Sequence, residues 1–172
     1  MVLYHGSDSD FIQFDVNKIK YVGCNGDGFY FTKDPDYAKT YGKIVKAWDV
    51  DIKNPLKPDS KILNVQDYIK ILNFIWYKSE YKDDLKNYGF FYDSDFKTVR
   101  DQLAKDLNNK KDDYYALFDL THTVTGSLRA VCEIVKKTIG KTYDGVISEG
   151  FGEYVAFFPD QIKLINKTVE NV

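Results

Sequence analysis

The chain contains very few histidine, cysteine and methionine residues. Its 172 residues include two His, two Cys and one Met. With so few histidines, a metal site built from several histidine ligands is excluded. The cysteines, Cys24 and Cys132, form no Cys-x-x-Cys or Cys/His spacing, which argues against both a zinc site and a disulfide framework. We therefore expect two free thiols and no bound metal.

The chain also lacks an excess of charge of one sign and a long apolar run. Lys and Arg total 24 against 26 Asp and Glu, a net charge of −2. Without a basic field, a nucleic-acid partner is disfavoured. No run approaches the roughly 18 apolar residues of a membrane span, and residues 1–10 are too polar for a signal peptide. These absences predict a soluble, cytoplasmic protein that does not bind a membrane.

Aromatic residues are abundant, with 14 Tyr and 12 Phe among 44% hydrophobic residues. A chain of this length is the size of one domain, so we expect a single domain over 1–172. Its core can be large enough to fold without disulfides or a metal.

Strand patterns occupy both ends of the chain and helix patterns occupy its middle. Strands are predicted at 2–4, 29–32, 44–52, 143–148 and 153–158, with one more edge strand at 162–165; helices are predicted at 65–78, 96–107, 114–120 and 128–139. This order predicts an α+β fold rather than a regular β-α alternation.

Several helix ends carry capping residues. Asp34 and Pro35 are typical of the N-cap and first position of a short helix that carries Tyr37, Ala38 and Tyr41 and ends at Gly42. Ser94 is a candidate N-cap for the helix at 96–107, and Gly140 a candidate C-cap for the helix at 128–139. The segment His5-Gly6-Ser7 is predicted to be a turn that ends the first strand.

Taken alone, each candidate site residue has a structural reading. His5 and Glu153 could be a hydrogen-bonded histidine and a strand-end charge. The tyrosines at 30, 37 and 41 could be core. Gly26-Asp27-Gly28 is part of a dinucleotide-binding pattern, but Phe31 stands where the third glycine would be, and the strand–loop–helix order is reversed.

Taken together and in order, these segments resemble the ADP-ribosyltransferase superfamily. The segments are His5-Gly6-Ser7, then Gly26-Asp27-Gly28-Phe29-Tyr30-Phe31-Thr32, then Tyr41, then Glu153-Tyr154-Val155. They resemble its His-Tyr-Glu branch, which includes diphtheria-type toxins and poly(ADP-ribose) polymerases. The final segment, Glu153 to Ile162, and "GDGFYFT" are similar to small ADP-ribosyltransferase-like domains of phage polyvalent proteins. The resemblance covers about the first 55 and the last 30 residues.

This resemblance implies a fold and a site. The fold would be a split β-sheet sandwich with a helical insertion at approximately 60–125. His5 would bind the adenine-side ribose of NAD, and the Gly6 backbone the nicotinamide amide. Tyr30 and Tyr41 would sandwich the nicotinamide ring, while Glu153 would contact the 2′-hydroxyl of the nicotinamide ribose. Ser7, Phe31 and Ala38 complete the implied NAD-binding set, and no metal is required.

The chain departs from the family pattern at two positions. Ala38 stands where relatives often have a serine that binds the nicotinamide amide. Phe151, two residues before Glu153, replaces the acidic or amide residue of arginine-modifying relatives, which disfavours arginine as acceptor.

Other charged and histidine residues leave alternatives open. Glu149 is a rival for the role of the carboxylate. Three lysines, Lys18, Lys20 and Lys33, either contact a bound pyrophosphate or are exposed to solvent without a ligand. His122 has no family counterpart and is either structural or a target contact.

The function implied by the resemblance is a mono-ADP-ribosyltransferase. It would cleave NAD and transfer ADP-ribose to a macromolecular target, expected to be a host protein, as an effector of a phage or mobile element against host defence. Two alternatives share the fold: a catalytically silent module that binds and blocks a partner protein, and an NAD glycohydrolase that transfers to water.

Overall fold

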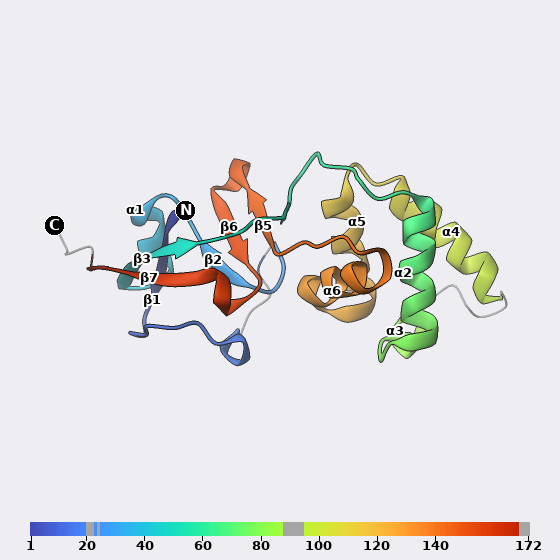
Figure 1. Ribbon diagram of the computed structural model, residues 1–172, viewed down its shortest axis with the longest axis horizontal. Helices are drawn as coiled ribbons and strands as arrows, with labels where there is room; N and C mark the ends of the chain where they lie inside the picture. The colour runs from blue at the N-terminus through green and yellow to red at the C-terminus, as the bar shows by residue number, and fades with distance from the viewer. Residues whose placement is uncertain (20–22, 24, 88–94, 169–172) are drawn as a thin grey trace. The chain divides into compact units, whose positions relative to one another are not determined.

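The computed structural model describes residues 1–19, 23, 25–87 and 95–168 and divides the chain into two compact units. Unit 1 consists of Met1–Pro55 and Asp144–Val172, and unit 2 consists of Leu56–Tyr143. The segment predicted as inserted, at approximately 60–125, lies within unit 2. Figure 1 follows the chain through both units.

The first sheet of unit 1 is antiparallel and has the order β1-β3-β7. Its strands are β1 (Val2–Ser7), β3 (Ile44–Val50) and β7 (Ile162–Thr168), with β7 at an edge as predicted. The predicted turn at His5-Gly6-Ser7 is wrong, because β1 continues to Ser7, which pairs with Ile44. The pairing partner, which lies far along the chain, extends the strand beyond its apolar run.

The second sheet has the order β2-β6-β5-β4. Its strands are β2 (Phe29–Phe31), β6 (Glu153–Ala156), β5 (Gly145–Ser148) and β4 (Pro55–Leu56). Strands β5 and β6 form a hairpin, visible in orange-red in Figure 1, whose turn ends at Gly152 with φ +66°. Two sheets with helices confirm the predicted α+β class.

Aromatic side chains from both sheets form one core in unit 1. Phe14 lies at its centre, with ring centroids 4.8 Å from Phe29 and 4.7 Å from Trp48. The remaining core residues are Leu3, Phe31, Val50, Ile52, Tyr154 and Ala156. Each large apolar side chain buried here contributes roughly 1.5–3 kcal/mol, so the aromatic excess of the sequence stabilises this unit.

A short helix follows β2, as the capping residues predicted. Helix α1 (Pro35–Ala38) begins after Asp34, whose carboxylate accepts hydrogen bonds from the backbone of Asp36 and Tyr37 at 2.8 and 3.3 Å. A 3₁₀ turn, Lys39–Tyr41, continues it to Gly42. A Cβ at Gly42 would lie 2.2 Å from the carbonyl carbon of Ser7, so this turn packs directly on the end of β1.

Unit 2 is helical. It contains α2 (Val65–Lys78), α3 (Lys82–Asn87), α4 (Phe96–Asn108), α5 (Asp113–Leu120) and α6 (Leu128–Ile139), with a π-helical turn at Thr121–Thr125. The four predicted helices are confirmed to within a residue at each end, whereas α3 and the π turn were not predicted. Gly140 caps α6 with φ +74°, as predicted. Ser94 lies outside the described residues, and Asp95 caps α4.

A buried carboxylate organises the core of unit 2. Asp113 is fully buried and accepts hydrogen bonds from the backbone of Ile62 and Leu63 and from the hydroxyls of Tyr68 and Tyr143. Burial, and then the neighbouring carboxylate, raises the pKa of both tyrosines. Both hydroxyls therefore stay protonated and remain donors to Asp113.

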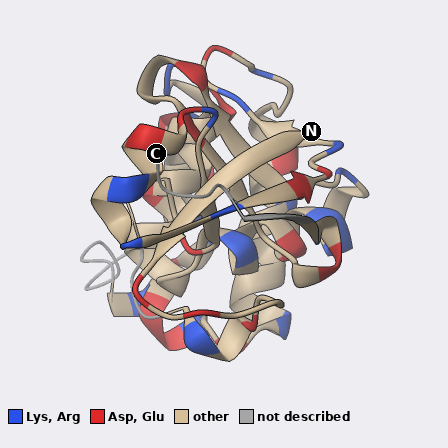
Figure 2. Ribbon diagram, turned by 90° about the vertical axis from the view of Figure 1, so that its left-hand side faces the viewer, with Lys and Arg blue, Asp and Glu red and all other residues tan. Residues whose placement is uncertain are grey.

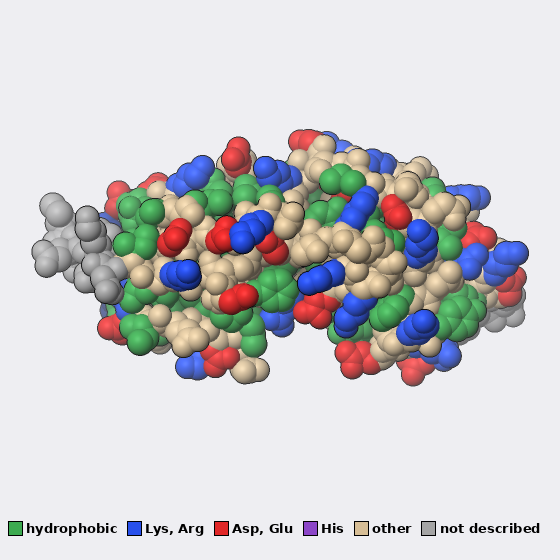
Figure 3. Space-filling model, in the orientation of Figure 1, with side chains coloured by type: hydrophobic (Ala, Val, Ile, Leu, Met, Phe, Trp, Pro, Cys, Tyr) green, Lys and Arg blue, Asp and Glu red, His purple; other side chains and the backbone are tan. Residues whose placement is uncertain are grey.

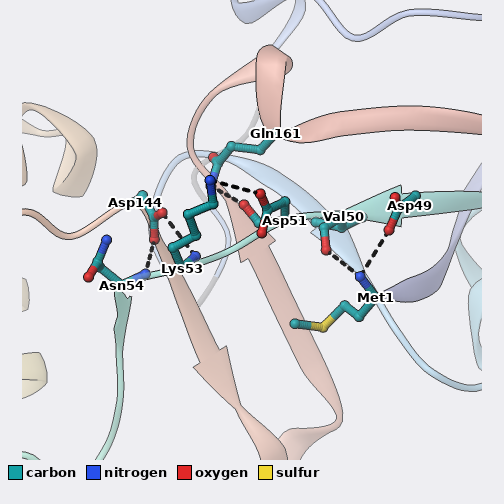
Figure 4. A network of polar contacts seen from close by, with 8 residues as sticks. All are labelled: Met1, Asp49, Val50, Asp51, Lys53, Asn54, Asp144 and Gln161. Atoms are coloured by element: carbon teal, nitrogen blue, oxygen red, sulfur yellow. Dashed lines mark hydrogen bonds and ion pairs between the residues drawn. The ribbon is translucent and has the colours of Figure 1, made fainter.

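A polar network in unit 1 brings together residues from the two ends of the sequence (Figure 4). The backbone N–H of Asp144 donates to the carbonyl of Asn54 at 3.1 Å, and its carboxylate accepts from the backbone N–H groups of Lys53 and Asn54. The Gln161 side chain donates to the carbonyl of Asp51 at 3.1 Å. These bonds place Asn54 next to Asp144.

Surface charge of both signs is mixed within the chain. Figure 2 shows basic and acidic residues interspersed over the ribbon, and Figure 3 shows hydrophobic side chains scattered among charged ones on the face that it presents. Of the two thiols, Cys132 is buried and is not part of a disulfide, and Cys24 lies outside the described residues. Among the described residues, no helix combines the length and the apolar character needed to span a bilayer.

Candidate functional site

A cavity of about 240 Å³ in unit 1 gathers the predicted site residues. Strands β1, β2 and β6 and helix α1 with its 3₁₀ turn all contribute to it. The lining residues are Tyr4, His5, Gly6, Tyr30, Phe31, Thr32, Tyr37, Ala38, Tyr41 and Glu153. Every predicted site residue except Ser7 is in this set.

The imidazole of His5 is held in one tautomer. Its Nδ1 lies 2.7 Å from the carbonyl oxygen of Tyr30, which can only accept, so Nδ1 carries the proton. Burial lowers the pKa of His5 from 6.5, although the bond to Tyr30 opposes this. The ring is therefore neutral at pH 7, and Nε2 presents a lone pair to a donor.

Aromatic rings fix the plane of the His5 side chain. The ring centroids of Phe11, Phe14 and Phe31 lie 5.7, 5.0 and 5.7 Å from that of His5. Because these rings belong to the core of unit 1 or pack against it, the position of His5 is set by the fold.

The glycine-rich turn before β2 holds Tyr30. The Tyr30 hydroxyl donates to the carbonyl of Gly26 at 2.6 Å and accepts from the backbone N–H of Asn25 at 3.2 Å. A Cβ at Gly23 would lie 2.3 Å from the same hydroxyl. The glycine at position 23 therefore lets the turn pack closely on the end of the tyrosine ring.

Glu153 begins β6 and is anchored by a residue that sequence reasoning missed. The Asn25 side-chain amide donates from Nδ2 to Oε2 of Glu153, and Asn25 is only 4% exposed. The two residues are 128 positions apart, and no local pattern links them. The rival carboxylate, Glu149, is exposed in the turn before β6 and is not among the lining residues.

Two tyrosines form an open wall of the cavity. The hydroxyls of Tyr37 and Tyr41 are 2.9 Å apart, and their rings meet edge to face at 5.5 Å. Tyr37 is 40% and Tyr41 59% exposed, so apolar ring surface remains available to a ligand. Tyr37 was not predicted as a site residue, although its spacing of four from Tyr41 was a usable signal.

Strand β1 and helix α1 meet at a glycine. A Cβ at Gly6 would lie 1.8 Å from the carbonyl oxygen of Ala38, so only glycine fits there. Ala38 is 1% exposed and has no hydroxyl to offer at the position where relatives often have a serine. Ser7 lies on β1 just beyond the cavity, and its hydroxyl accepts from the backbone N–H of Ser9.

The lysines considered for a pyrophosphate do not line the cavity. Lys20 lies outside the described residues, and Lys18 lies beside a separate surface pocket. The ammonium of Lys33 lies 5.0 Å from the centre of the Tyr154 ring. The Lys33 ammonium donates a hydrogen bond to Tyr154, and this bond, followed by the charge of Tyr154 and then that of Glu149, raises the pKa of Lys33.

His122 belongs to unit 2 and is not part of the cavity. It is exposed on the π-helical turn, with its ring 4.5 Å from Phe118 in an edge-to-face contact. Over the described part of the chain, no group of three His, Cys, Asp or Glu residues could hold a metal ion.

Comparisons with known proteins give one family and one structure. A family described as "ADP-Ribosyltransferase in polyvalent proteins" matches residues 1–171. A search of curated proteins finds no match. One solved structure, described as the crystal structure of an anti-CRISPR protein, is 16% identical, covers 96% of this chain and 95% of its own, and has a TM-score of 0.36.

Proposed function

Because the chain belongs to the family of ADP-ribosyltransferases in polyvalent proteins, we propose that it cleaves NAD and transfers one ADP-ribose to a macromolecular acceptor. The observation that carries this proposal is that three separate strands place His5, Tyr30 and Glu153 around one cavity. As part of this proposal, the two sheets correspond to the halves of the split sandwich of the family's fold.

The proposed chemistry requires a fixed negative charge. Breaking the bond between nicotinamide and ribose builds positive charge on the sugar, and a preorganised carboxylate stabilises it as it develops. Glu153 supplies that carboxylate at the start of β6, where Asn25 fixes one of its oxygens. The other oxygen is left for the ribose 2′-hydroxyl.

The remaining cavity residues bind and orient NAD. The faces of Tyr30 and Tyr41 suit a flat nicotinamide ring and exclude water from the reacting carbon. Nε2 of neutral His5 accepts a hydrogen bond from a ribose hydroxyl. The cavity of about 240 Å³ is below the roughly 300–1,000 Å³ of sites that enclose a whole drug-sized ligand, so it encloses only part of the dinucleotide.

The acceptor is proposed to be a protein of the host cell, in the cytoplasm. Phe151 lies two residues before Glu153 and is 77% exposed. An exposed apolar side chain beside the carboxylate suits an apolar surface on the acceptor. Its lack of charge also disfavours an arginine acceptor, which an acidic neighbour would attract.

One observation favours a second candidate function. The buried methyl of Ala38 lines the cavity where relatives often have a hydroxyl, so one contact to the nicotinamide amide is absent. A module that has lost NAD binding, and instead binds and blocks a partner, would tolerate that loss. An NAD glycohydrolase, which transfers ADP-ribose to water, shares the complete site.

Nicotinamide release from NAD, with and without host lysate, tests the proposal. We expect wild type to release nicotinamide and to label a lysate protein, and Glu153→Gln to lose 10²- to 10³-fold in rate while still binding NAD in isothermal titration. Glu149→Gln is the matched control and should keep full activity.

Each alternative has its own result in the same experiment. Absence of binding heat with NAD would support the silent module and contradict the proposal. Free ADP-ribose as the sole product, with no labelled acceptor, would support the glycohydrolase. Equal losses in Glu153→Gln and Glu149→Gln would refute the assignment of the carboxylate.

A further inference from the structure

Asn25 connects two site residues that no local pattern connects. Its backbone N–H donates to the Tyr30 hydroxyl at 3.2 Å, and its side-chain Nδ2 donates to Oε2 of Glu153. Tyr30 in turn accepts a bond from His5 through its carbonyl. Hydrogen bonds therefore link His5 to Tyr30, Tyr30 to Asn25 and Asn25 to Glu153.

The burial of Asn25 makes this contact specific. At 4% exposed, the amide is removed from water, and a buried polar group that loses its partner is costly to the fold. The residue that follows Asn25 is also held by hydrogen bonds: the Gly26 N–H donates to the Gly23 carbonyl at 3.0 Å, and the Gly26 carbonyl accepts from Tyr30. These bonds help to keep the Asn25 amide against Glu153.

The chemistry of an amide suits a carboxylate that must keep its charge. A lysine or arginine at this position would form an ion pair with Glu153 and offset the negative charge that the reaction uses. The neutral amide instead fixes one carboxylate oxygen in place and leaves the net charge of the group unchanged. The other oxygen keeps its lone pairs for substrate.

We propose that Asn25 is a positioning residue for the transfer reaction, which holds the Glu153 carboxylate in its productive orientation through the Nδ2–Oε2 hydrogen bond. This inference rests on the proposed function. It predicts that Asn25 acts on the rate of the chemical step and not on the binding of NAD, because Asn25 is not among the residues that line the cavity.

The test compares two asparagines of unit 1. Asn25→Asp is nearly isosteric but replaces the donor with a carboxylate, so it should lower kcat for nicotinamide release about 10- to 100-fold. KM and the Kd for NAD from isothermal titration should change less than about threefold. Asn17→Asp is the matched control, because Asn17 Nδ2 also donates to a carboxylate, that of Asp15, but at an exposed site; its kinetics should equal those of wild type.

A second variant separates positioning from loss of structure. Asn25→Gln keeps the amide donor and adds one methylene, so it should recover part of the kcat lost in Asn25→Asp. If instead all Asn25 variants lose Tm and kcat together and Asn25→Gln recovers nothing, the residue is structural and the inference is overturned. An unchanged kcat in Asn25→Asp, with active wild type, would also overturn it.

A measurement without turnover separates this inference from the proposed function. In NMR, the side-chain amide protons of Asn25 should be protected from solvent exchange in wild type and lose protection in Glu153→Ala, whether or not the chain is an active enzyme. If wild type has no activity but this protection is observed, the proposed function fails while the contact stands. If wild type is active and the amide exchanges freely, the inference alone fails.

Discussion

Replacing Gly6 with alanine tests how closely the cavity is assembled. A Cβ at this position would lie 1.8 Å from the carbonyl oxygen of Ala38 and 2.8 Å from its carbon. Since real Cβ atoms essentially never approach another heavy atom within 3.0 Å, β1 and α1 must separate by about 1.2 Å, and both clashing atoms are backbone. Overpacking of this kind costs about 1–3 kcal/mol in the free energy of unfolding.

The same displacement should damage the site. Separation of α1 from β1 moves Tyr41 away from His5, so the two walls of the cavity no longer match one ligand. A misplacement of about 1 Å can cost about 10²-fold in turnover. Gly6→Ala should therefore weaken NAD binding and activity beyond the fraction of protein that is unfolded.

Urea unfolding with tryptophan fluorescence measures this effect. Trp48 is the tryptophan of unit 1, and Trp76→Phe removes the signal of unit 2. Gly150→Ala is the control, because a Cβ there meets nothing within 4 Å, and it should stay within about 0.5 kcal/mol of wild type. A Gly6→Ala protein as stable as Gly150→Ala, with unchanged NAD affinity, would refute the close packing of β1 on α1.

Three further predictions follow from burial and exposure. Because burial lowers the pKa of His5 from 6.5, the unfolded chain takes up a proton on this imidazole more readily than the folded chain. The free energy of unfolding should therefore fall as the pH drops below 6.5 and should not depend on His5 above that pH. Urea titrations between pH 5 and 8 should show this fall in wild type and a smaller one in His5→Gln. Tyr41→Ala should weaken NAD binding about threefold to tenfold, as expected for the loss of one aromatic contact, yet leave Tm nearly unchanged because the side chain is 59% exposed; a large drop in Tm would contradict that. Asp113→Ala should lower the free energy of unfolding by about 3–5 kcal/mol, because it leaves buried donors, including the Tyr68 hydroxyl, without an acceptor. Thermal unfolding at the wild-type Tm would contradict this and would show that those donors find other partners.

Local chemistry predicted the helices well. Asn64 accepts from the backbone N–H groups of Gln66 and Asp67, which fixes the start of α2 where periodicity alone placed it. Gly140 ended α6 in the same way, through a left-handed conformation that favours glycine. Helix α3 is only six residues long and buries only Leu85, too little periodicity to be recognised in the sequence.

Contacts between distant residues could not be predicted from local patterns. Strand β1 continues to Ser7 only because β3 pairs with it, and the contact between Asn25 and Glu153 depends on how β2 and β6 are aligned. The site residues themselves were suggested by a family resemblance, and the structure adds why each is held where it is. The role of Glu153 stays a prediction until activity is measured.

The bond between Asn54 and Asp144 has a consequence for the order of folding. The chain leaves unit 1 near Asn54 and returns to it at Asp144, and these two residues are hydrogen-bonded to each other. Within unit 1, the whole of unit 2 is therefore an insertion that connects two neighbouring points. During synthesis from the N-terminus, His5 and Tyr30 emerge before that loop and Glu153 emerges after it. Unit 2, which is continuous in sequence, can fold while unit 1 still waits for its last three strands. The cavity is therefore completed only when β6 has joined β2, and a nascent chain lacks the proposed NAD site until then.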